Sequence, residues 1–457
     1  MRLPRPTLLS LSLLLASGMA DSASAATVIR GARLIDGTGA PPLEDVTMVV
    51  DGDRISVLGA GLRVKMPDGT RVVDYTGKTI IPGIVSDHGH IGSVDGTKSG
   101  LPELYTRANA LRQLKQWQAY GVTTVTSLGV NDPAVFYPLR ADLHAGKADG
   151  ADLFGADHGI GVPGGAPPAK MMKAGPNQLD RPSTPDEARA FTDAAIERGT
   201  DVVKIWVDDF NGSLPVKMKP EIWRAVIAEA HARHRRVAAH VYYLDDARQL
   251  VTDGVDILAH GVRDKPVDDA FVQALKRHGT WYIATLDLNE AAYVYAQHPA
   301  WMDQPFFTHA VQPDLAKQFA DPAWRQHVAA DKATGVNQQA LQTNLQNLKT
   351  LYTAGVKIGF GTDAGAMPLR IPGFAEHREL ALMVDAGLTP LQAIQIATQR
   401  GAQLLELDDR GVLAKGKRAD FVVLDADPSN DIEATTKIDA VWQAGKQVAG
   451  KVETFRP

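Results

Sequence analysis

The chain has 457 residues, more than a typical single-core domain but within the range of one barrel with a smaller appended domain. Apolar residues make up 44% of it, charged residues 22%, and the formal net charge is −5, so nothing favours nucleic acid or an anionic membrane as a partner. The absence of cysteine excludes a disulfide framework and thiolate metal ligands. We therefore expect a small-molecule partner.

The first 25 residues have the pattern of a secretory signal peptide. Arg2 and Arg5 precede an apolar run over residues 8–20, and small residues at 23–25 supply a cleavage site. The run is too short for a confident membrane span. We expect a periplasmic or secreted bacterial protein that has no membrane contact after signal cleavage, with an uncleaved anchor as the alternative.

The two ends of the remaining chain share a β texture. Residues 27–37 and 46–55 alternate strands with Gly/Asp turns, and a similar pattern returns at residues 416–425. We expect residues 26–81 and 406–457 to form one composite β-sandwich domain.

Between these ends, strands alternate with amphipathic helices such as residues 108–120 and 220–234. The predicted strands are the apolar run ending at His88 and residues 122–128, 151–155, 202–207, 237–241, 257–259, 281–286 and 356–361. Eight such units predict an α/β fold, a (β/α)8 TIM barrel over residues 82–405. In this fold, reactive side chains gather where the strands end.

A long segment over residues 287–346 separates the seventh and eighth predicted strands. It is rich in Gln, Trp and Phe and partly helical by pattern. Long insertions at the catalytic face often form lids or subunit contacts. We expect one of these functions for the insertion, and a homo-oligomer for the chain.

Metal-ligand residue types follow the predicted strands in a fixed order. They are His88 and His90 of a His-Gly-His run, Lys204, His240, His260 and Asp363. A His-x-His pair places both imidazoles on one side of an extended strand, and a lysine in an apolar strand needs a chemical reason to be buried. Each residue alone is more often structural. Together, at the ends of strands in a closed barrel, they favour a metal site.

These residues carry a resemblance to the amidohydrolase superfamily. Residues 80–90, the Lys204 strand, both later histidines and residues 359–365 are similar to its imidazolonepropionase-like and prolidase-like members, which include Xaa-dipeptidases and N-acyl amino acid hydrolases. The chain departs from the pattern at Ser86, where the family usually has aspartate. The adjacent Asp87 should point away from the metal by strand alternation, so we exclude it as a ligand.

The resemblance implies a dinuclear centre bridged by a modified lysine. His88, His90 and Asp363 would hold one metal and His240 and His260 the other, with carboxylated Lys204 between them. Nitrogen and oxygen ligands suit zinc, with cobalt or manganese as alternatives. The simpler alternative is an unmodified lysine beside a single metal.

Such a site predicts hydrolysis without a protein nucleophile. Two cations would bring the pKa of a bridging water toward neutrality, and Asp363 would act as general acid and base on the leaving nitrogen. Tyr242, two residues beyond His240, could donate to the developing oxyanion, although it could equally be a packing residue.

Two residues near the expected barrel mouth could bind the substrate. His158 lies in a turn-rich loop after the third strand, and Arg263 follows His260 by three residues. Either could hold a substrate carboxylate.

The expected function is hydrolysis of an amide C–N bond in a dipeptide or an N-acyl amino acid. Alternatives within the superfamily are a mononuclear deaminase or cyclic-amide hydrolase, and an esterase or lactonase. A scaffold without catalytic activity is a different class, and the complete ligand set argues against it.

Overall fold

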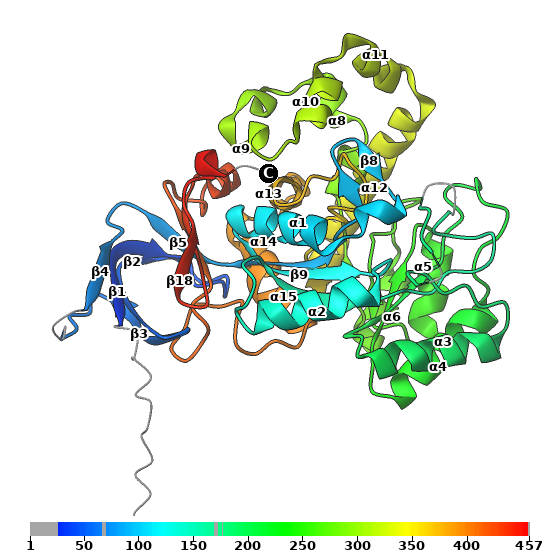
Figure 1. The fold of residues 1–457 in the computed structure, drawn as a ribbon, viewed down its shortest axis with the longest axis horizontal. Coiled ribbons are helices and arrows are strands. Elements are labelled where there is room, and N and C mark those ends of the chain that lie inside the picture. The colour runs from blue at the N-terminus through cyan, green and yellow to red at the C-terminus, as the bar shows by residue number, and fades with distance from the viewer. Residues whose placement is uncertain (1–25, 66–69, 169–171, 176, 456–457) are drawn as a thin grey trace, which may run out of the picture.

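The structure is a computed structural model that describes residues 26–65, 70–168, 172–175 and 177–455 (Figure 1). The expected signal peptide, residues 1–25, lies outside these ranges. Within them, no helix has both the length and the apolar character needed to cross a membrane.

Strands from both ends of the chain pair in one eight-stranded sheet, where blue and red strands lie side by side in Figure 1. Its order is β18-β17-β16-β5-β1-β2-β3, and β4 pairs with β1. The strands are β1 (Thr27–Leu34), β2 (Leu43–Asp51), β3 (Arg54–Ala60), β4 (Arg71–Asp74), β5 (Thr79–Pro82), β16 (Phe421–Leu424), β17 (Ile438–Gln443) and β18 (Lys446–Ala449).

The two halves of this sheet meet where β5 and β16 run antiparallel, with Ile81 opposite Val422. Phe421 and Trp442 stack at 5.2 Å between ring centroids in the apolar core of this sheet. Both ends of the chain thus contribute to one unit. Because the pairing defines one sheet, the two layers of a β-sandwich stay a prediction.

Eight parallel strands follow in the predicted order, in two sheets. The first has the order β10-β9-β6 and the second the order β11-β12-β13-β14-β15. Their bounds are β6 (Ile84–Gly89), β9 (Val122–Leu128), β10 (Asp152–Ala156), β11 (Val203–Trp206), β12 (Val237–His240), β13 (Ile257–Leu258), β14 (Trp281–Ile283) and β15 (Ile358–Gly359). Nearly all of their residues are buried, as expected for parallel strands covered by helices.

Backbone hydrogen bonds connect the two sheets at both edges. Asp363 N–H donates to His88 O at 2.9 Å, which joins the segment after β15 to β6. Ile160 N–H donates to Lys204 O at 2.7 Å, which joins the segment after β10 to β11. The fold is therefore an α/β fold of the TIM-barrel type.

Helices cover the strands, and several begin with a side-chain cap. Thr184 accepts a hydrogen bond from Glu187 N–H ahead of Pro185, a combination that favours a helix start. The helices are α1 (Arg107–Ala119), α2 (Pro133–His144), α3 (Pro185–Arg198), α4 (Pro220–Ala232), α5 (Leu244–Thr252), α6 (Asp269–His278), α13 (Phe374–Asp385), α14 (Pro390–Gln395) and α15 (Gly401–Leu404).

The insertion between β14 and β15 is helical. It contains α7 (Asp287–Glu290), α8 (Val294–Gln297), α9 (Pro305–Thr308), α10 (Pro313–Ala320), α11 (Pro322–Ala330) and α12 (Lys332–Thr353). Figure 1 shows α8 to α11 as a lobe beside the strands, while α12 returns to them. Asn344 Nδ2 on α12 donates to Ala284 O at 2.8 Å, which fixes the returning helix next to β14.

Candidate metal centre and active-site cavity

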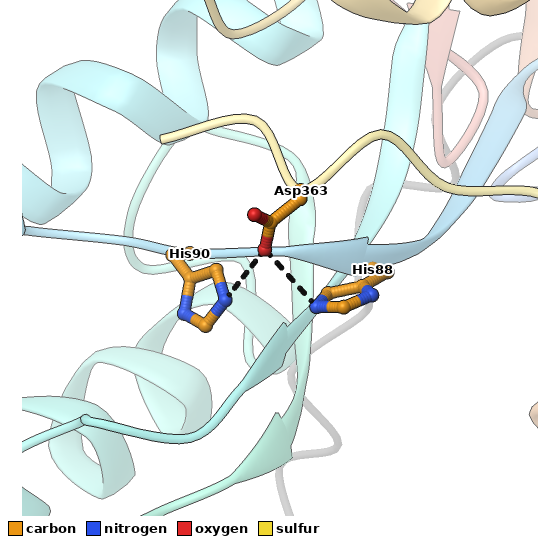
Figure 2. A group of neighbouring side chains, drawn as sticks. All are labelled: His88, His90 and Asp363. Carbon is orange, nitrogen blue, oxygen red and sulfur yellow. Dashed lines mark ion pairs between the residues drawn. The ribbon is translucent and has the colours of Figure 1, made fainter. Parts of the chain in front are cut away.

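His88, His90 and Asp363 form one compact cluster (Figure 2). Asp363 Oδ1 lies 3.2 Å from His88 Nε2 and 3.0 Å from His90 Nε2, and all three side chains are buried. One ligand atom from each residue lies within 4.8 Å of the others, a spacing that suits a single metal ion. The first and eighth strands thus bring these three predicted ligands together.

The backbone around Asp363 explains how the eighth strand approaches the first. A Cβ atom at Gly361 would lie 2.7 Å from His88 N, so only glycine permits this approach. Asp363 has a φ of 64°, in the left-handed region that is unfavourable for a residue with a side chain. Strain of this kind is common where a functional side chain must face a particular direction.

His240 and His260 continue the cluster. The His260 ring centroid lies 4.5 Å from that of His88 and 4.3 Å from that of His240. The four predicted histidine ligands are therefore contiguous, although they come from β6, β12 and the segments after β6 and β13.

Hydrogen bonds at Nδ1 leave Nε2 of three histidines available. His88 Nδ1 lies 2.5 Å from Ala259 O and His90 Nδ1 lies 3.3 Å from Gly129 O; because a carbonyl oxygen only accepts, both Nδ1 atoms carry the proton. His260 Nδ1 lies 2.9 Å from Thr285 Oγ1. Partners of this kind orient metal-binding imidazoles and fix their tautomer, so the arrangement fits a metal.

His240 differs because its Nε2 lies 2.8 Å from Asp208 Oδ2. Asp208 Oδ1 accepts hydrogen bonds from the backbone N–H groups of Asp209 and Phe210. Burial by itself would raise the pKa of Asp208, but the hydrogen bond and charge of His240 outweigh burial and the pKa is lowered. Only Nδ1 of His240 is left for a metal in this arrangement. Sequence reasoning gave Asp208 no function.

Lys204 lies on β11 with 1% of its surface exposed. Its Nζ finds no hydrogen-bond partner among the described residues, and burial lowers its pKa to about 7. Burial, and then the charge of Lys204, lower the pKa of His88 to about 3. The lysine therefore faces the imidazole cluster, and its amine loses its proton far more readily than an exposed lysine does.

A cavity of about 410 Å³ opens over this centre. Six of the predicted site residues line it: His90, His240, Tyr242, His260, Arg263 and Asp363. His158 is absent from its described lining, and its Nδ1 lies instead 3.1 Å from Asp180 Oδ2. A larger cavity of about 510 Å³ lies between α9 and the terminal sheet, and none of the predicted ligands lines it.

Arg263 and Tyr242 stand together on one wall of the cavity. The Arg263 guanidinium lies 5.0 Å from the Tyr242 ring centroid. One of its terminal nitrogens donates to Val241 O and Gly261 O, at 3.2 and 2.8 Å. Within the described ranges its Nε has no hydrogen-bond partner. By contrast Tyr243 is directed to Asp209, at 2.8 Å.

Arg370 is a cavity residue that sequence reasoning missed. It lies in the segment between β15 and α13, and its guanidinium forms an ion pair with Asp363 Oδ2. Burial would raise the pKa of Asp363, but the charge of Arg370 and the two histidines hold the pKa well below its usual range. No strand ends at Arg370, so the pattern of strand ends could not indicate it.

The sequence profile of the Amidohydrolase family matches residues 79–448. The chain belongs to this family. It is therefore a hydrolase acting on carbon–nitrogen bonds. Members of the family generally use divalent metals, and the His-His-Asp group of this chain is consistent with that.

Individual relatives agree with the predicted branch. An imidazolonepropionase from Deinococcus deserti is 25% identical over 437 residues, which cover 89% of this chain and 92% of that protein. A guanine deaminase from Escherichia coli is 23% identical, with 84% of this chain and 82% of that protein covered. The crystal structure of a Xaa-Pro dipeptidase with methionine in its active site has a TM-score of 0.73 and 24% identity, and the match covers 93% and 99% of the two chains. The predicted superfamily is thus confirmed.

Proposed function

We propose that the chain is a dinuclear metal-dependent hydrolase that cleaves the amide C–N bond of a dipeptide or an N-acyl amino acid. The observation that carries the proposal is the cluster of His88, His90 and Asp363, whose ligand atoms lie within 4.8 Å of one another. His260 continues this cluster, with its ring centroid 4.5 Å from that of His88. The resemblance to a Xaa-Pro dipeptidase structure supports the substrate class.

In this proposal His88, His90 and Asp363 hold one metal ion and His240 and His260 hold the second. Carboxylated Lys204 would be a ligand shared between the two ions, for which we propose zinc. Carboxylation needs a neutral amine to add to carbon dioxide, and a buried Nζ with a pKa of about 7 supplies that form near neutral pH. A carbamate would also turn a buried cation into an anion beside the metals, which removes the cost of burying the ammonium.

When bound, the two metals acidify water and polarise the scissile carbonyl. Asp363 would move the proton from the attacking water to the leaving nitrogen, which requires its ion pair with Arg370 to loosen. Tyr242 would donate a hydrogen bond to the developing oxyanion. Arg263 would bind the substrate carboxylate. His158 is the less favoured candidate for this contact because its Nδ1 already lies beside Asp180.

The wider proposal concerns the assembly and its setting. The eight parallel strands close into a barrel, and the terminal sheet folds into a sandwich beside it. We also propose a homo-oligomer in the bacterial periplasm or outside the cell, with no nucleic acid partner.

The proposal is tested by metal analysis followed by a substrate screen. Protein purified with zinc and bicarbonate should hold about two metals per chain, and it should cleave members of a panel of dipeptides and N-acyl amino acids rather than lactones. His88→Asn should lose metal and activity, whereas His327→Asn, an exposed histidine on α11, should keep both. About one metal per chain with activity on cyclic amidines would instead favour the mononuclear deaminase, and no bound metal would favour a scaffold.

A further inference from the structure

Glu379 is a buried carboxylate that the proposed reaction does not use. It lies on α13 with 0% of its surface exposed, and its two oxygens accept hydrogen bonds from the backbone N–H groups of Leu286 and Asp287, at 2.9 and 2.8 Å. These two residues lie where the chain leaves β14 and enters α7. A buried carboxylate is costly unless it is hydrogen-bonded, and here both oxygens are committed to one turn of backbone.

The residue just before this turn has a strained backbone. Thr285 has a φ of 49°, in the left-handed region, where a β-branched residue is an outlier. Such a conformation persists only where the surrounding structure holds it in place. Since Glu379 binds the next two N–H groups along the chain, it is the side chain placed to hold Thr285 in this conformation.

The strained threonine contacts a predicted metal ligand. Thr285 Oγ1 lies 2.9 Å from Nδ1 of His260, and both residues are 1% exposed. When Nδ1 donates its proton to the hydroxyl oxygen, Nε2 carries no proton and can bind a metal. The hydroxyl reaches His260 because of the backbone conformation of Thr285, so whatever holds that backbone also orients the imidazole.

A second buried carboxylate on α13 serves a different part of the centre. Glu376 Oε1 accepts hydrogen bonds from Ser86 Oγ at 3.1 Å and from Thr362 Oγ1 at 3.0 Å. Glu376 therefore joins β6 to the segment that carries Asp363, whereas the hydrogen bonds of Glu379 go to the segment after β14. The two carboxylates, one helical turn apart, have separate contacts.

We propose that Glu379 positions the second metal site by acting through Thr285 on His260. The carboxylate holds the backbone at the start of α7, the Thr285 hydroxyl holds His260 Nδ1, and His260 offers Nε2 to the metal. For its effect on metal binding this assignment rests on the proposed function, whereas its effect on the His260 proton is independent of any metal. Glu379 is a positioning residue and not a ligand.

Glu379→Gln tests the assignment because an amide cannot replace the carboxylate. Glutamine has one oxygen and one NH₂ group, so one of the two backbone N–H groups would meet a donor. In a zinc titration against a chromophoric chelator, this variant should bind zinc at the His240–His260 site about 10–100-fold more weakly and at the other site as tightly as wild type. Asp385→Asn, which changes an exposed carboxylate on the same helix, should match wild type at both sites.

Two changes at Thr285 test the intermediate contact. Thr285→Val keeps the shape of the side chain but removes the hydroxyl, and it should weaken zinc binding at the second site about as much as Glu379→Gln does. Thr285→Ser keeps the hydroxyl and should retain both zinc ions.

A double variant separates positioning from a general loss of packing. His260→Asn lacks a ligand of the second site and identifies that site in the titration. Adding Glu379→Gln to it should not weaken the remaining zinc site, because His260 is no longer there to be positioned. A residue that only stabilised the fold would weaken the remaining site as well.

The proton on His260 gives a readout that needs neither metal nor turnover. In nitrogen NMR of metal-free, histidine-labelled wild type, with the His260 signal assigned by its loss in His260→Asn, the proton should reside on Nδ1. Glu379→Gln and Thr285→Val should each give a mixture of the two tautomers, whereas Asp385→Asn should give the wild-type spectrum.

These measurements keep the positioning of His260 apart from the dinuclear centre. Wild-type affinity at the second site, an unchanged His260 tautomer in a folded Glu379→Gln variant, or a further loss of zinc in the double variant would each overturn the assignment. A wild type that binds a single zinc, with a tautomer still altered by Glu379→Gln, would contradict the dinuclear centre and support the positioning of His260. If melting curves show that Glu379→Gln does not fold, Glu379→Asp takes its place. It keeps both oxygens but withdraws them by one methylene, so it should show the same pattern with smaller losses.

Discussion

Asp208 Oδ2 lies 2.8 Å from His240 Nε2, so the loop after β11 orients a predicted ligand on β12. The aspartate is itself held by two backbone N–H groups, from Asp209 and Phe210. This contact selects the nitrogen that His240 can offer to a metal. Asp208 thus acts on the proposed second metal without being one of its expected ligands.

Asp208→Asn should weaken the second metal site while leaving the fold intact. Loss of such a partner typically lowers metal affinity by about 10–100-fold. We expect about one tightly held metal per chain after dialysis, measured by elemental analysis. Asp209→Asn is the matched control because Asp209 contacts Tyr243 rather than a histidine, and it should retain both metals. Equal metal loss in both variants would remove this function from Asp208.

Lys204→Ala should abolish activity and lower metal content. Without a bridging anion, two cations would repel each other across the gap. Short carboxylic acids such as propionate should restore part of both by occupying the space of the missing carbamate. A variant that retains two metals and near-native turnover would contradict the bridging function.

Asp363→Asn should lower turnover by about two orders of magnitude or more, since a general acid–base supplies about 10²–10⁴-fold. Its backbone N–H bond to His88 O does not involve the side chain, so folding should survive. The comparison requires variant and wild type with matched metal content. An unchanged rate constant under those conditions would exclude proton transfer by Asp363.

Arg263→Lys should raise KM for a carboxylate substrate far more than KM for its amide or methyl-ester analogue. Lysine cannot reproduce the planar fork that binds a carboxylate bidentately. The hydrogen bonds from Arg263 to Val241 O and Gly261 O raise the competing possibility of a structural residue. Equal losses on both substrates, together with a lower melting temperature, would support that alternative.

His377 gives a prediction about acid stability. It is buried between Thr435 Oγ1 and Tyr120 O, and burial lowers its pKa from 6.5 to about 4. Between these pH values the unfolded chain binds a proton that the folded chain does not, so stability is lost as the pH falls from 6.5 toward 4. The advantage in melting temperature of wild type over His377→Gln should therefore shrink over this range.

Sequence patterns were sufficient to predict the order of the eight parallel strands. Each predicted strand overlaps an observed one because these strands are short apolar runs bounded by polar or glycine-rich turns, as in residues 122–128 and 237–240. Once these strands were predicted, the histidine, lysine and aspartate residues at their ends could be recognised as candidate metal ligands. The strand order predicted that His88, His90 and Asp363 would come together, but their close approach also needs glycine at position 361 and the positive φ of Asp363.

Contacts made by irregular segments could not be predicted. Asp208 reaches His240 because the chain turns sharply after β11, and Arg370 reaches Asp363 because a loop folds back. Neither geometry follows a period of two or 3.6 residues. The hydrogen bond from Asn289 Nδ2 to Asn337 Oδ1 joins residues 48 positions apart in the insertion. The helices of this insertion do not belong to the alternation of strand and helix, so their positions could not be predicted from it.

The pairing of β5 with β16 places residue 82 opposite residue 421. During synthesis, β5 therefore stays without this neighbour until residues 421–424 have been made. Contacts of such long sequence separation form slowly, because a long loop must close first. A truncation that removes β16 to β18 should leave an apolar edge exposed and favour aggregation, so residues 421–449 determine when folding can finish as well as how the sheet is built.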